Sequence, residues 1–316
     1  IDYIVIGIGK KSFSELIHQL KEGNNGIAIP GIAKTAPGAS LSSIPRDYGP
    51  YDLMNDCAPR YDLVARYREH YVLEKLGMKM GFVITAYGCT HRCSFCTIPG
   101  TTGGKYLVHS PESVIRDIRV LGDIPFIRMV DANTFGDPEG SNALCRKIKE
   151  LGNRKKYIAD VRADTIIRHY DVLKDWKEAG LHAVVVGFED IEDRRIEGYN
   201  KKYKSHIIPR SIELLHELGM LIVGDFIVSP EYTEEDFVRL EQFIVTHKIQ
   251  VPVLSVLTPI PGTPLHKVMK GRIIIHDLDY YTFTNAVVPT ALPEKAFYET
   301  FSDLVKRLHG KTSKSG

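Results

Sequence analysis

The chain has 316 residues, with a hydrophobic share of 43% and a charged share of 25%, and these ordinary globular values exclude collagen, a coiled coil and general disorder. The 41 Lys and Arg residues nearly balance the 39 Asp and Glu residues, so the net charge is only +2 and no nucleic-acid partner is expected. No apolar run approaches the roughly 20 residues needed to cross a bilayer, so we expect no transmembrane segment.

The first residues of the chain predict one strand and one helix. Residues 2–6 have the apolar pattern of a strand, and residues 12–20 have apolar side chains on one face of a helix. Because the chain begins without an initiator Met or a signal-peptide pattern, we expect residues 1–22 to be the end of a preceding domain. Prolines and glycines then predict a linker over residues 23–80, with a short helix over residues 61–71.

Six short apolar runs alternate with helical patterns from residue 81 onward. The predicted strands are residues 81–87, 125–131, 156–161, 182–188, 220–228 and 251–257. The predicted helices between them include residues 112–121, 171–179, 206–218 and 237–247, with Ser, Thr or Gly at their ends. Strand followed by helix, repeated in this way, predicts right-handed βαβ units and a parallel sheet.

The repeat predicts an α/β fold of the (βα)6 partial TIM-barrel type over residues 81–265. A doubly wound sheet is a poorer match because no glycine-rich phosphate turn opens the first helix. A helical C-terminal extension is expected over residues 266–309, followed by a tail over residues 310–316. In barrels of this kind the chemistry lies at the C-terminal ends of the strands.

Three cysteines follow the first of these strands with the spacing Cys-x3-Cys-x2-Cys, at Cys89, Cys93 and Cys96. Thiolates are soft ligands that suit iron–sulfur clusters or zinc, and three on one loop can hold one face of a cluster. Five cysteines distributed in this way do not resemble a secreted disulfide framework. We therefore expect a metal site in a reducing compartment, the cytoplasm.

The segment ITAYGCTHRCSFC, residues 84–96, resembles the cluster loop of the radical S-adenosylmethionine (radical SAM) superfamily, in which an aromatic residue precedes the third cysteine as Phe95 does here. The resemblance implies that Cys89, Cys93 and Cys96 hold a 4Fe-4S cluster whose fourth iron is chelated by SAM. It also implies that one electron, from a donor such as flavodoxin or ferredoxin, cleaves SAM to methionine and a 5′-deoxyadenosyl radical.

The resemblance extends to polar residues at the ends of three further strands. Relatives place polar groups that reach SAM or the substrate where Asp131 and Asn133 stand. The segment Gly-Phe-Glu-Asp, residues 187–190, resembles the family's G-I-E-S segment and gives Glu189 a place near the ribose, with an exposed loop carboxylate as the alternative. Arg162 would pair with the SAM carboxylate, or alternatively form a surface ion pair.

Two other segments resemble radical SAM enzymes that carry a cobalamin domain. The loop LTPIPGTPL, residues 257–265, would place Pro259 in a rigid wall near the adenine, although a purely structural loop is the competing interpretation. Residues 2–20 resemble the last strand and helix of the Rossmann-like cobalamin-binding domain. Because the rest of that domain is not in this chain, we expect cobalamin to be bound by a full-length protein rather than by these residues alone.

Residues 160–293 look most like the hopanoid C-3 methylase-type branch of the superfamily. This resemblance implies C-methylation of an unactivated carbon in a small molecule or a hopanoid-like lipid.

A second interpretation is methylthiolation of transfer RNA by a related radical SAM enzyme, but Cys57 and Cys145 are too scattered to hold a second cluster. A third is a non-catalytic protein with structural zinc, for which His91 would be the fourth ligand. The basic run at residues 201–204 is expected to be a solvated surface.

Overall fold

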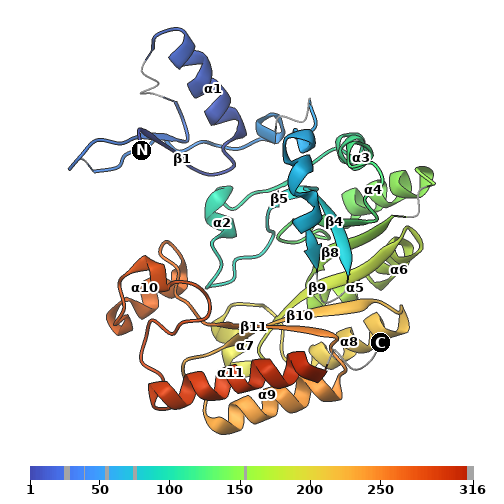
Figure 1. Cartoon of the computed structure of the whole chain (residues 1–316), viewed down its shortest axis with the longest axis vertical. Helices are drawn as coiled ribbons and strands as arrows, with labels where there is room; N and C mark the ends of the chain where they lie inside the picture. The colour runs from blue at the N-terminus through green and yellow to red at the C-terminus, as the bar shows by residue number, and fades with distance from the viewer. Residues whose placement is uncertain (25–28, 39, 54–56, 74–76, 153–154, 312–316) are drawn as a thin grey trace.

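Six parallel strands form the centre of the structure, as the sequence pattern predicts, and they curl into a partial barrel (Figure 1). The computed structural model describes residues 1–24, 29–38, 40–53, 57–73, 77–152 and 155–311. The sheet order is β11-β10-β9-β8-β7-β4-β3, in which the short β3 pairs antiparallel with β4 at one edge. The strands are β3 (Val72–Leu73), β4 (Met78–Val83), β7 (Phe126–Met129), β8 (Lys156–Val161), β9 (Leu181–Glu189), β10 (Leu221–Val228) and β11 (Val251–Val256).

Helices follow the parallel strands, and their ends are capped as their sequences predict. Ser110 accepts a hydrogen bond from the Ser113 N–H at the start of α3, and Thr233 and Asp236 form a capping box at the start of α9. The helices are α2 (Ile98–Thr101), α3 (Pro111–Val120), α4 (Pro138–Glu150), α5 (Ala163–Arg168), α6 (Tyr170–Glu178), α7 (Asp193–Gly198), α8 (Ile207–Glu217), α9 (Glu234–Thr246), α10 (Pro264–Met269) and α11 (Glu294–Lys311).

The main core lies between the sheet and these helices. Its largest fully buried side chain is Trp176 of α6, which meets the Phe135 ring edge-on at 5.7 Å and donates a hydrogen bond to the Ser141 hydroxyl at 2.9 Å. Burying each such apolar side chain contributes about 1.5 to 3 kcal/mol. The apolar faces of strands and helices therefore fix the half-barrel, and its strand ends can carry polar groups.

The first predicted barrel strand, residues 81–87, is wrong in one respect: the chain leaves the sheet after Val83. Residues Ala86–Gly88 form β5, which pairs antiparallel with β6 (Tyr106–Val108) in a separate two-stranded sheet. The cause is the buried carboxylate of Asp131, which accepts hydrogen bonds from the backbone N–H groups of Thr85 and Ala86 at 2.7 and 3.0 Å. These bonds replace the ladder partners that a continued strand would have used.

The N-terminal residues form β1 (Tyr3–Val5), α1 (Lys10–Lys21) and β2 (Ile32–Lys34), which lie together at one end of the molecule (Figure 1). The β1 strand pairs antiparallel with β2, a short strand within the predicted linker. The predicted helix at residues 61–71 is a 3-10 helix over Tyr61–His70, and a second 3-10 helix spans Pro50–Leu53. The predicted domain boundaries stay predictions, and residues 312–316 of the predicted tail lie outside the described residues.

Among the described residues, no helix is both long enough and apolar enough to cross a membrane. The longest helix, α11, has an amphipathic sequence and packs against α9 and β11. Its apolar side chains Phe297, Leu304 and Leu308 belong to the main core. This helix therefore covers one side of the half-barrel, and the predicted C-terminal extension is helical here.

Candidate metal and cofactor site

The three-cysteine loop begins directly after β5, where Gly88 makes a turn that other residues adopt poorly. Its φ angle is +84°, in the left-handed region that favours glycine. A Cβ atom at this position would lie 2.0 Å from the Lys105 carbonyl oxygen. The loop that starts at Cys89 therefore depends on a glycine for its direction.

We expect Gly88→Ala to lower the free energy of unfolding by about 2 kcal/mol or more, because both the φ angle and the Lys105 contact are incompatible with a Cβ atom. Denaturant titration followed by the fluorescence of the single tryptophan measures the change. Gly271→Ala is the control, since a Cβ atom there meets nothing within 4 Å. Equal stability of the two variants would contradict the predicted strain.

Segments from two other parts of the chain clamp the loop. The Ser94 N–H donates to the Tyr199 carbonyl at 3.0 Å, and the Asn200 side-chain amide donates to the Arg92 carbonyl at 2.7 Å. On the other side, the Leu265 N–H donates to the Ser94 carbonyl at 2.8 Å. The loop is thus held between the segment after α7 and the proline-rich loop after β11.

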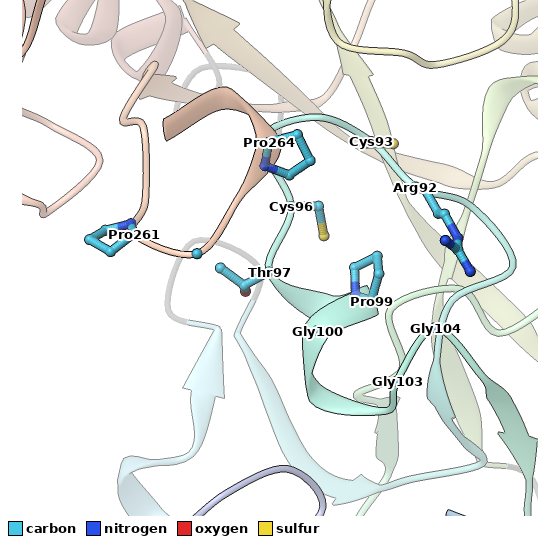
Figure 2. Close-up of a pocket in the computed structure, with 11 residues that line it drawn as sticks. Arg92, Cys93, Cys96, Thr97, Pro99, Gly100, Gly103, Gly104, Pro261 and Pro264 are labelled. Atoms are coloured by element: carbon cyan, nitrogen blue, oxygen red, sulfur yellow. The ribbon is translucent and has the colours of Figure 1, made fainter. Parts of the chain in front are cut away.

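A cavity of about 450 Å³ lies between the cysteine loop and the proline-rich loop (Figure 2). Cys93 and Cys96 both line it, and its other walls are mainly glycine and proline. Small side chains leave backbone atoms close to whatever occupies the space, and prolines keep the opposite wall stiff. The lining is completed by Arg92, Thr97, Pro99, Gly100, Gly103, Gly104, Pro261, Gly262 and Pro264.

The three thiols are half-buried and close enough to influence one another. Burial raises the pKa values of Cys89 and Cys96, and the neighbouring cysteines raise them further. Within the described ranges, no three Cys, His, Asp or Glu side chains are already arranged around one point. A bound cation would remove the repulsion between adjacent thiolates, so this donor set fits a thiolate-ligated iron–sulfur group.

His91 lies beside these cysteines with a hydrogen bond to its own neighbour. Its Nδ1 atom lies 3.0 Å from the Thr90 hydroxyl oxygen. Burial lowers the His91 pKa to about 4, so the ring is neutral at physiological pH. Its role as the fourth ligand of a zinc site stays a prediction.

Arg162, the first residue after β8, brings a buried guanidinium to the cysteine loop. Its Nη1 atom lies 4.0 Å from the Cys93 sulfur, while its Nε atom donates to the Asp164 carboxylate at 2.9 Å. The Nη2 atom donates to the Lys201 carbonyl at 2.6 Å. A surface ion pair therefore does not describe this residue, because its cation is held inside the protein beside the Cys93 thiol.

Glu189 and Lys201 form a buried ion pair next to Arg162. The Lys201 ammonium lies 2.8 Å from the Glu189 carboxylate, and the lysine side chain is only 4% exposed. Burial lowers the pKa of Lys201, but the Glu189 carboxylate together with Tyr203 and Cys93 outweighs this and raises it, so the lysine is charged. The prediction of a solvated surface for residues 201–204 is therefore wrong at Lys201. The alternative of an exposed carboxylate is wrong for Glu189.

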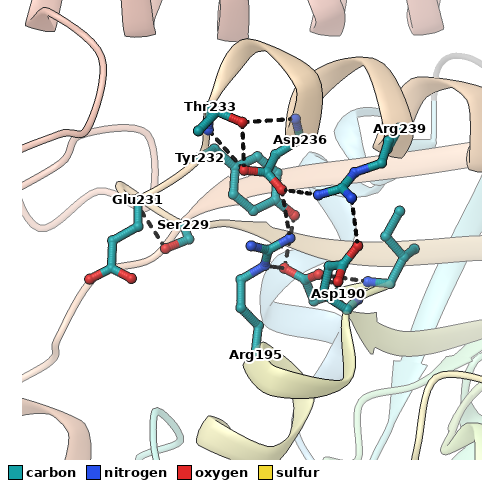
Figure 3. A network of polar contacts seen from close by, with 10 residues as sticks. Asp190, Arg195, Ser229, Glu231, Tyr232, Thr233, Asp236 and Arg239 are labelled. Atoms are coloured by element: carbon teal, nitrogen blue, oxygen red, sulfur yellow. Dashed lines mark hydrogen bonds and ion pairs between the residues drawn. The ribbon is translucent and has the colours of Figure 1, made fainter.

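Glu189 has a φ angle of +66°, which is unusual for a residue other than glycine. The next residue, Asp190, is fully buried and fixes the turn by accepting from the Ile191 and Glu192 N–H groups at 2.7 and 2.9 Å. Its carboxylate also accepts from the Tyr232 hydroxyl at 2.8 Å and pairs with the Arg195 guanidinium at 2.7 Å (Figure 3). Such strain persists only where its surroundings hold it.

The same network joins the turn after β9 to the turn after β10. Arg195 donates to Asp236, the capping residue of α9, at 3.1 Å, and Arg239 donates to the same carboxylate at 2.6 Å (Figure 3). Burial raises the pKa of Asp236, but hydrogen bonds from Thr233 and Arg239 outweigh this and lower it to about 2. At neutral pH the ionised Asp236, Arg195 and Arg239 side chains therefore hold the turns after β9 and β10 together.

Asp131 and Asn133 follow β7 and are both buried, but neither lines the cavity beside the cysteine loop. The Asp131 carboxylate also accepts from the Thr85 hydroxyl at 2.6 Å, so it positions the chain that leads into the cysteine loop. Within the described chain, the Asn133 side-chain amide has no hydrogen-bond partner on either polar atom, although it is only 1% exposed. A bound polar group would satisfy this amide. The cofactor roles of both residues stay predictions.

Phe95 and Pro259 are the remaining residues that the sequence predicts at the cofactor. The Phe95 ring meets the Tyr199 ring edge-on at 5.5 Å and lines a second cavity, of about 440 Å³, together with Glu189. Pro259 is buried, and its neighbours Thr258 and Pro261 line the second and the first cavity respectively. Phe95 and Glu189 therefore line the same cavity as the start of the proline-rich loop.

Two functional candidates, Lys201 and Asp225, were missed from the sequence. Asp225 interrupts the apolar strand LIVGDFIV, and an acid within such a strand is a signal that could have identified it. It lines the second cavity, and burial raises its pKa to about 7. Lys201 had no such signal, because it stands in a run of lysines that are otherwise exposed.

Comparison with known proteins identifies relatives over nearly the whole chain. The sequence is 27% identical over 306 residues to the hopanoid C-3 methylase of Methylococcus capsulatus, covering 97% of this chain and 57% of that protein. It is 24% identical over 238 residues to the bacteriochlorophyllide d C-8(2)-methyltransferase of Chlorobaculum tepidum, covering 71% of this chain and 52% of that protein. The chain therefore spans between half and two thirds of the length of these relatives.

A solved structure supports the fold. The radical S-adenosylmethionine methyltransferase TsrM from Kitasatospora setae, with cobalamin and a 4Fe-4S cluster bound, superposes with a TM-score of 0.68. The two chains are 21% identical, and the match covers 87% of this chain and 54% of TsrM. The sequence model of the radical SAM superfamily matches residues 83–244. Since this match includes more than half of the residues and contains all three cysteines of the loop, the chain belongs to the radical SAM superfamily.

Proposed function

We propose that this chain contains the catalytic core of a cobalamin-type radical SAM methyltransferase, which places a methyl group on an unactivated carbon. The observation that carries the proposal is the loop with Cys89, Cys93 and Cys96 at the C-terminal end of a parallel half-barrel, where Arg162 contacts the Cys93 sulfur. When bound, a 4Fe-4S cluster with SAM supplies the one-electron cleavage chemistry that an unactivated carbon requires.

The residues of the chain hold and orient these groups. The three thiols ligate the cluster, and a donor such as flavodoxin or ferredoxin supplies the electron. The Arg162 guanidinium is suited to a carboxylate, and the clamped loop keeps the thiols at fixed positions. Apolar side chains around Phe95 line the interior of the half-barrel and disfavour water there. Cobalamin is expected to bind the full-length protein.

The relatives support a methyl acceptor of low polarity. The similarity to a hopanoid C-3 methylase favours a hopanoid-like lipid, although the bacteriochlorophyllide methyltransferase indicates that acceptors differ between relatives. A tRNA methylthiotransferase has less support, because the relatives named above are methyltransferases of a hopanoid and of bacteriochlorophyllide. Within this chain, Cys57 is exposed and Cys145 is buried in the main core, so these two do not form a second cluster site.

Anaerobic reconstitution with iron and sulfide tests the proposal. We expect brown protein with about four irons per chain, and formation of 5′-deoxyadenosine and methionine from SAM under dithionite. A colourless protein with one zinc per chain would contradict the radical SAM reaction.

Methyl transfer is tested separately, with the full-length protein, cobalamin, methyl-labelled SAM and a hopanoid as the acceptor. Transfer of the label to carbon in the lipid supports the methyltransferase. SAM cleavage without label in the lipid would refute the hopanoid acceptor and leave the cleavage reaction established.

A further inference from the structure

The segment directly after α7 packs against the cysteine loop and carries a third cavity, of about 260 Å³. The Asn200 side-chain amide donates to the Arg92 carbonyl of the loop at 2.7 Å, and the Ser94 hydroxyl donates to the Gly198 carbonyl at 2.9 Å. A molecule bound on this segment is therefore next to the loop of the three cysteines. The cavity is lined by Glu197, Asn200, Lys202, Tyr203 and Lys204.

A short route of side chains leads from the third cavity to a cysteine sulfur. The Tyr203 ring lines the cavity, and the Arg162 guanidinium lies 5.5 Å from the centre of that ring. The same guanidinium lies 4.0 Å from the Cys93 sulfur. The ring is held in place because its hydroxyl donates to the Gly187 carbonyl at 3.2 Å. Since electron transfer between proteins slows with the distance between their redox centres, this side of the loop suits the approach of a reducing partner.

Exposed cations surround the third cavity. The side chains of Arg92 and Lys202 are exposed and form no ion pair within the described part of the chain. Lys204 pairs with Glu197 at 3.3 Å, but both side chains are more than half exposed, and pairs of this kind contribute little. The ammonium groups at the rim of the cavity are therefore free to contact a partner.

Other acidic side chains of this region are engaged by the protein itself. The Asp164 carboxylate pairs with the guanidinium groups of Arg162 and Arg168, at 2.9 and 2.7 Å. The Asp193 carboxylate accepts a hydrogen bond from the Ser205 N–H at 2.6 Å. The charges left without an internal partner at this face are therefore positive, although the net charge of the whole chain is only +2.

We propose that this face binds an acidic one-electron carrier protein, whose carboxylates contact Arg92, Lys202 and Lys204. The assignment rests on the proposed function and names the side from which its electron enters. The reduced carrier is oxidised by one electron, the group ligated by the three cysteines is reduced by that electron, and no bond or proton is exchanged. Complementary charges mainly speed the encounter of two proteins, so the expected effect is on the rate of association.

Stopped-flow reduction of the reconstituted 316-residue chain tests the inference. Reduced flavodoxin and reduced ferredoxin serve as acidic carriers, and dithionite serves as a small reductant that needs no docking surface. The double variant Lys202→Glu/Lys204→Glu is expected to be reduced by the carriers at least about tenfold more slowly at low ionic strength. Its reduction by dithionite should be nearly unchanged, which also shows that the variant is folded. At about 0.5 M salt the difference between the variant and the wild type should nearly vanish, because salt screens the charges.

Lys295→Glu/Lys306→Glu is the matched control, because both lysines are exposed and lie on α11. This control should be reduced by the carriers at the wild-type rate. Calorimetry on the chain without a cluster is a second measurement, in which the affinity for oxidised flavodoxin should fall at least about tenfold in Lys202→Glu/Lys204→Glu and not in the control. Equal rates and equal affinities in the two double variants would overturn the inference.

The docking surface and the proposed function fail separately in these experiments. A chain that binds the carriers at this face but forms no 5′-deoxyadenosine with dithionite would refute the proposed function and leave the surface established. A chain that cleaves SAM with dithionite, yet takes electrons from both carriers equally fast after the charge reversal, would refute the surface alone. Binding of transfer RNA at this face, with no binding of either carrier to the wild type, would also refute the surface.

Discussion

Replacing Cys93 with alanine is expected to abolish both the visible absorption of the reconstituted cluster and the formation of 5′-deoxyadenosine. Three thiolates are the minimum local ligand set, and two cannot hold one face of a four-iron cluster. The Cys93 sulfur also lies 4.0 Å from the Arg162 guanidinium, so its loss leaves a buried cation without this sulfur partner. Iron content, absorption and product formation by mass spectrometry measure the effect. Cys89→Ala and Cys96→Ala should give the same loss.

Cys57→Ala is the matched control for these variants, because it makes the same chemical change at an exposed cysteine away from the loop. It should retain about four irons per chain and full product formation. A Cys93→Ala protein that keeps its cluster, or a Cys57→Ala protein that loses it, would show that the ligands have been assigned to the wrong thiols.

Replacing Lys201 with methionine is expected to lower the free energy of unfolding by about 3 to 5 kcal/mol, since it leaves the Glu189 carboxylate buried without its cation. Denaturant titration followed by tryptophan fluorescence is suitable, because the single tryptophan, Trp176, is fully buried in the main core. The same variant should weaken the site, because Arg162 donates to the Lys201 carbonyl and Glu189 lines the second cavity.

The adjacent lysine offers a matched control. Lys202→Met makes the same chemical change at the next residue, whose side chain is exposed, and should alter stability by less than about 0.5 kcal/mol. Combining Lys201→Met with Glu189→Gln removes the orphaned charge and should recover part of the lost stability. If Lys201→Met were as stable as Lys202→Met, the buried ion pair would not form in solution.

The strands of the half-barrel could be predicted closely, because strands buried on both faces appear as continuous apolar runs. The predicted strand at residues 156–161 has the same bounds as β8, and the strand at residues 220–228 differs from β10 by one residue. The first strand was predicted less well. Its apolar run continues through residue 87, but a hydrogen-bonding partner distant in sequence, Asp131, takes the chain out of the sheet.

The cysteine loop was also predictable, because its ligands are local in sequence and their spacing is specific. Arg162 and Glu189 were predicted near it from the family resemblance, but Lys201 and Asp225 were not, because neither stands at the end of a strand. Lys201 turns inward since its neighbours Asn200 and Lys202 both have left-handed φ angles, of 57° and 64°. Nothing in a run of lysines distinguishes the one that faces the interior. Asp225 was recognisable as unusual, but its lack of a partner depends on Arg128 and Lys201 pairing elsewhere.

The sheet order ends at β11 on one side and at β3 on the other, so the barrel is not closed. As a result, most of the wall of the second cavity is built by the edge strand β11 and by the chain that follows it, within residues 251–284, whereas Asp225 and Ile227 come from β10. The cysteine loop is built from a different stretch, near residue 90. A change within this contiguous C-terminal stretch can therefore reshape most of the second cavity without altering the loop that carries the three cysteines.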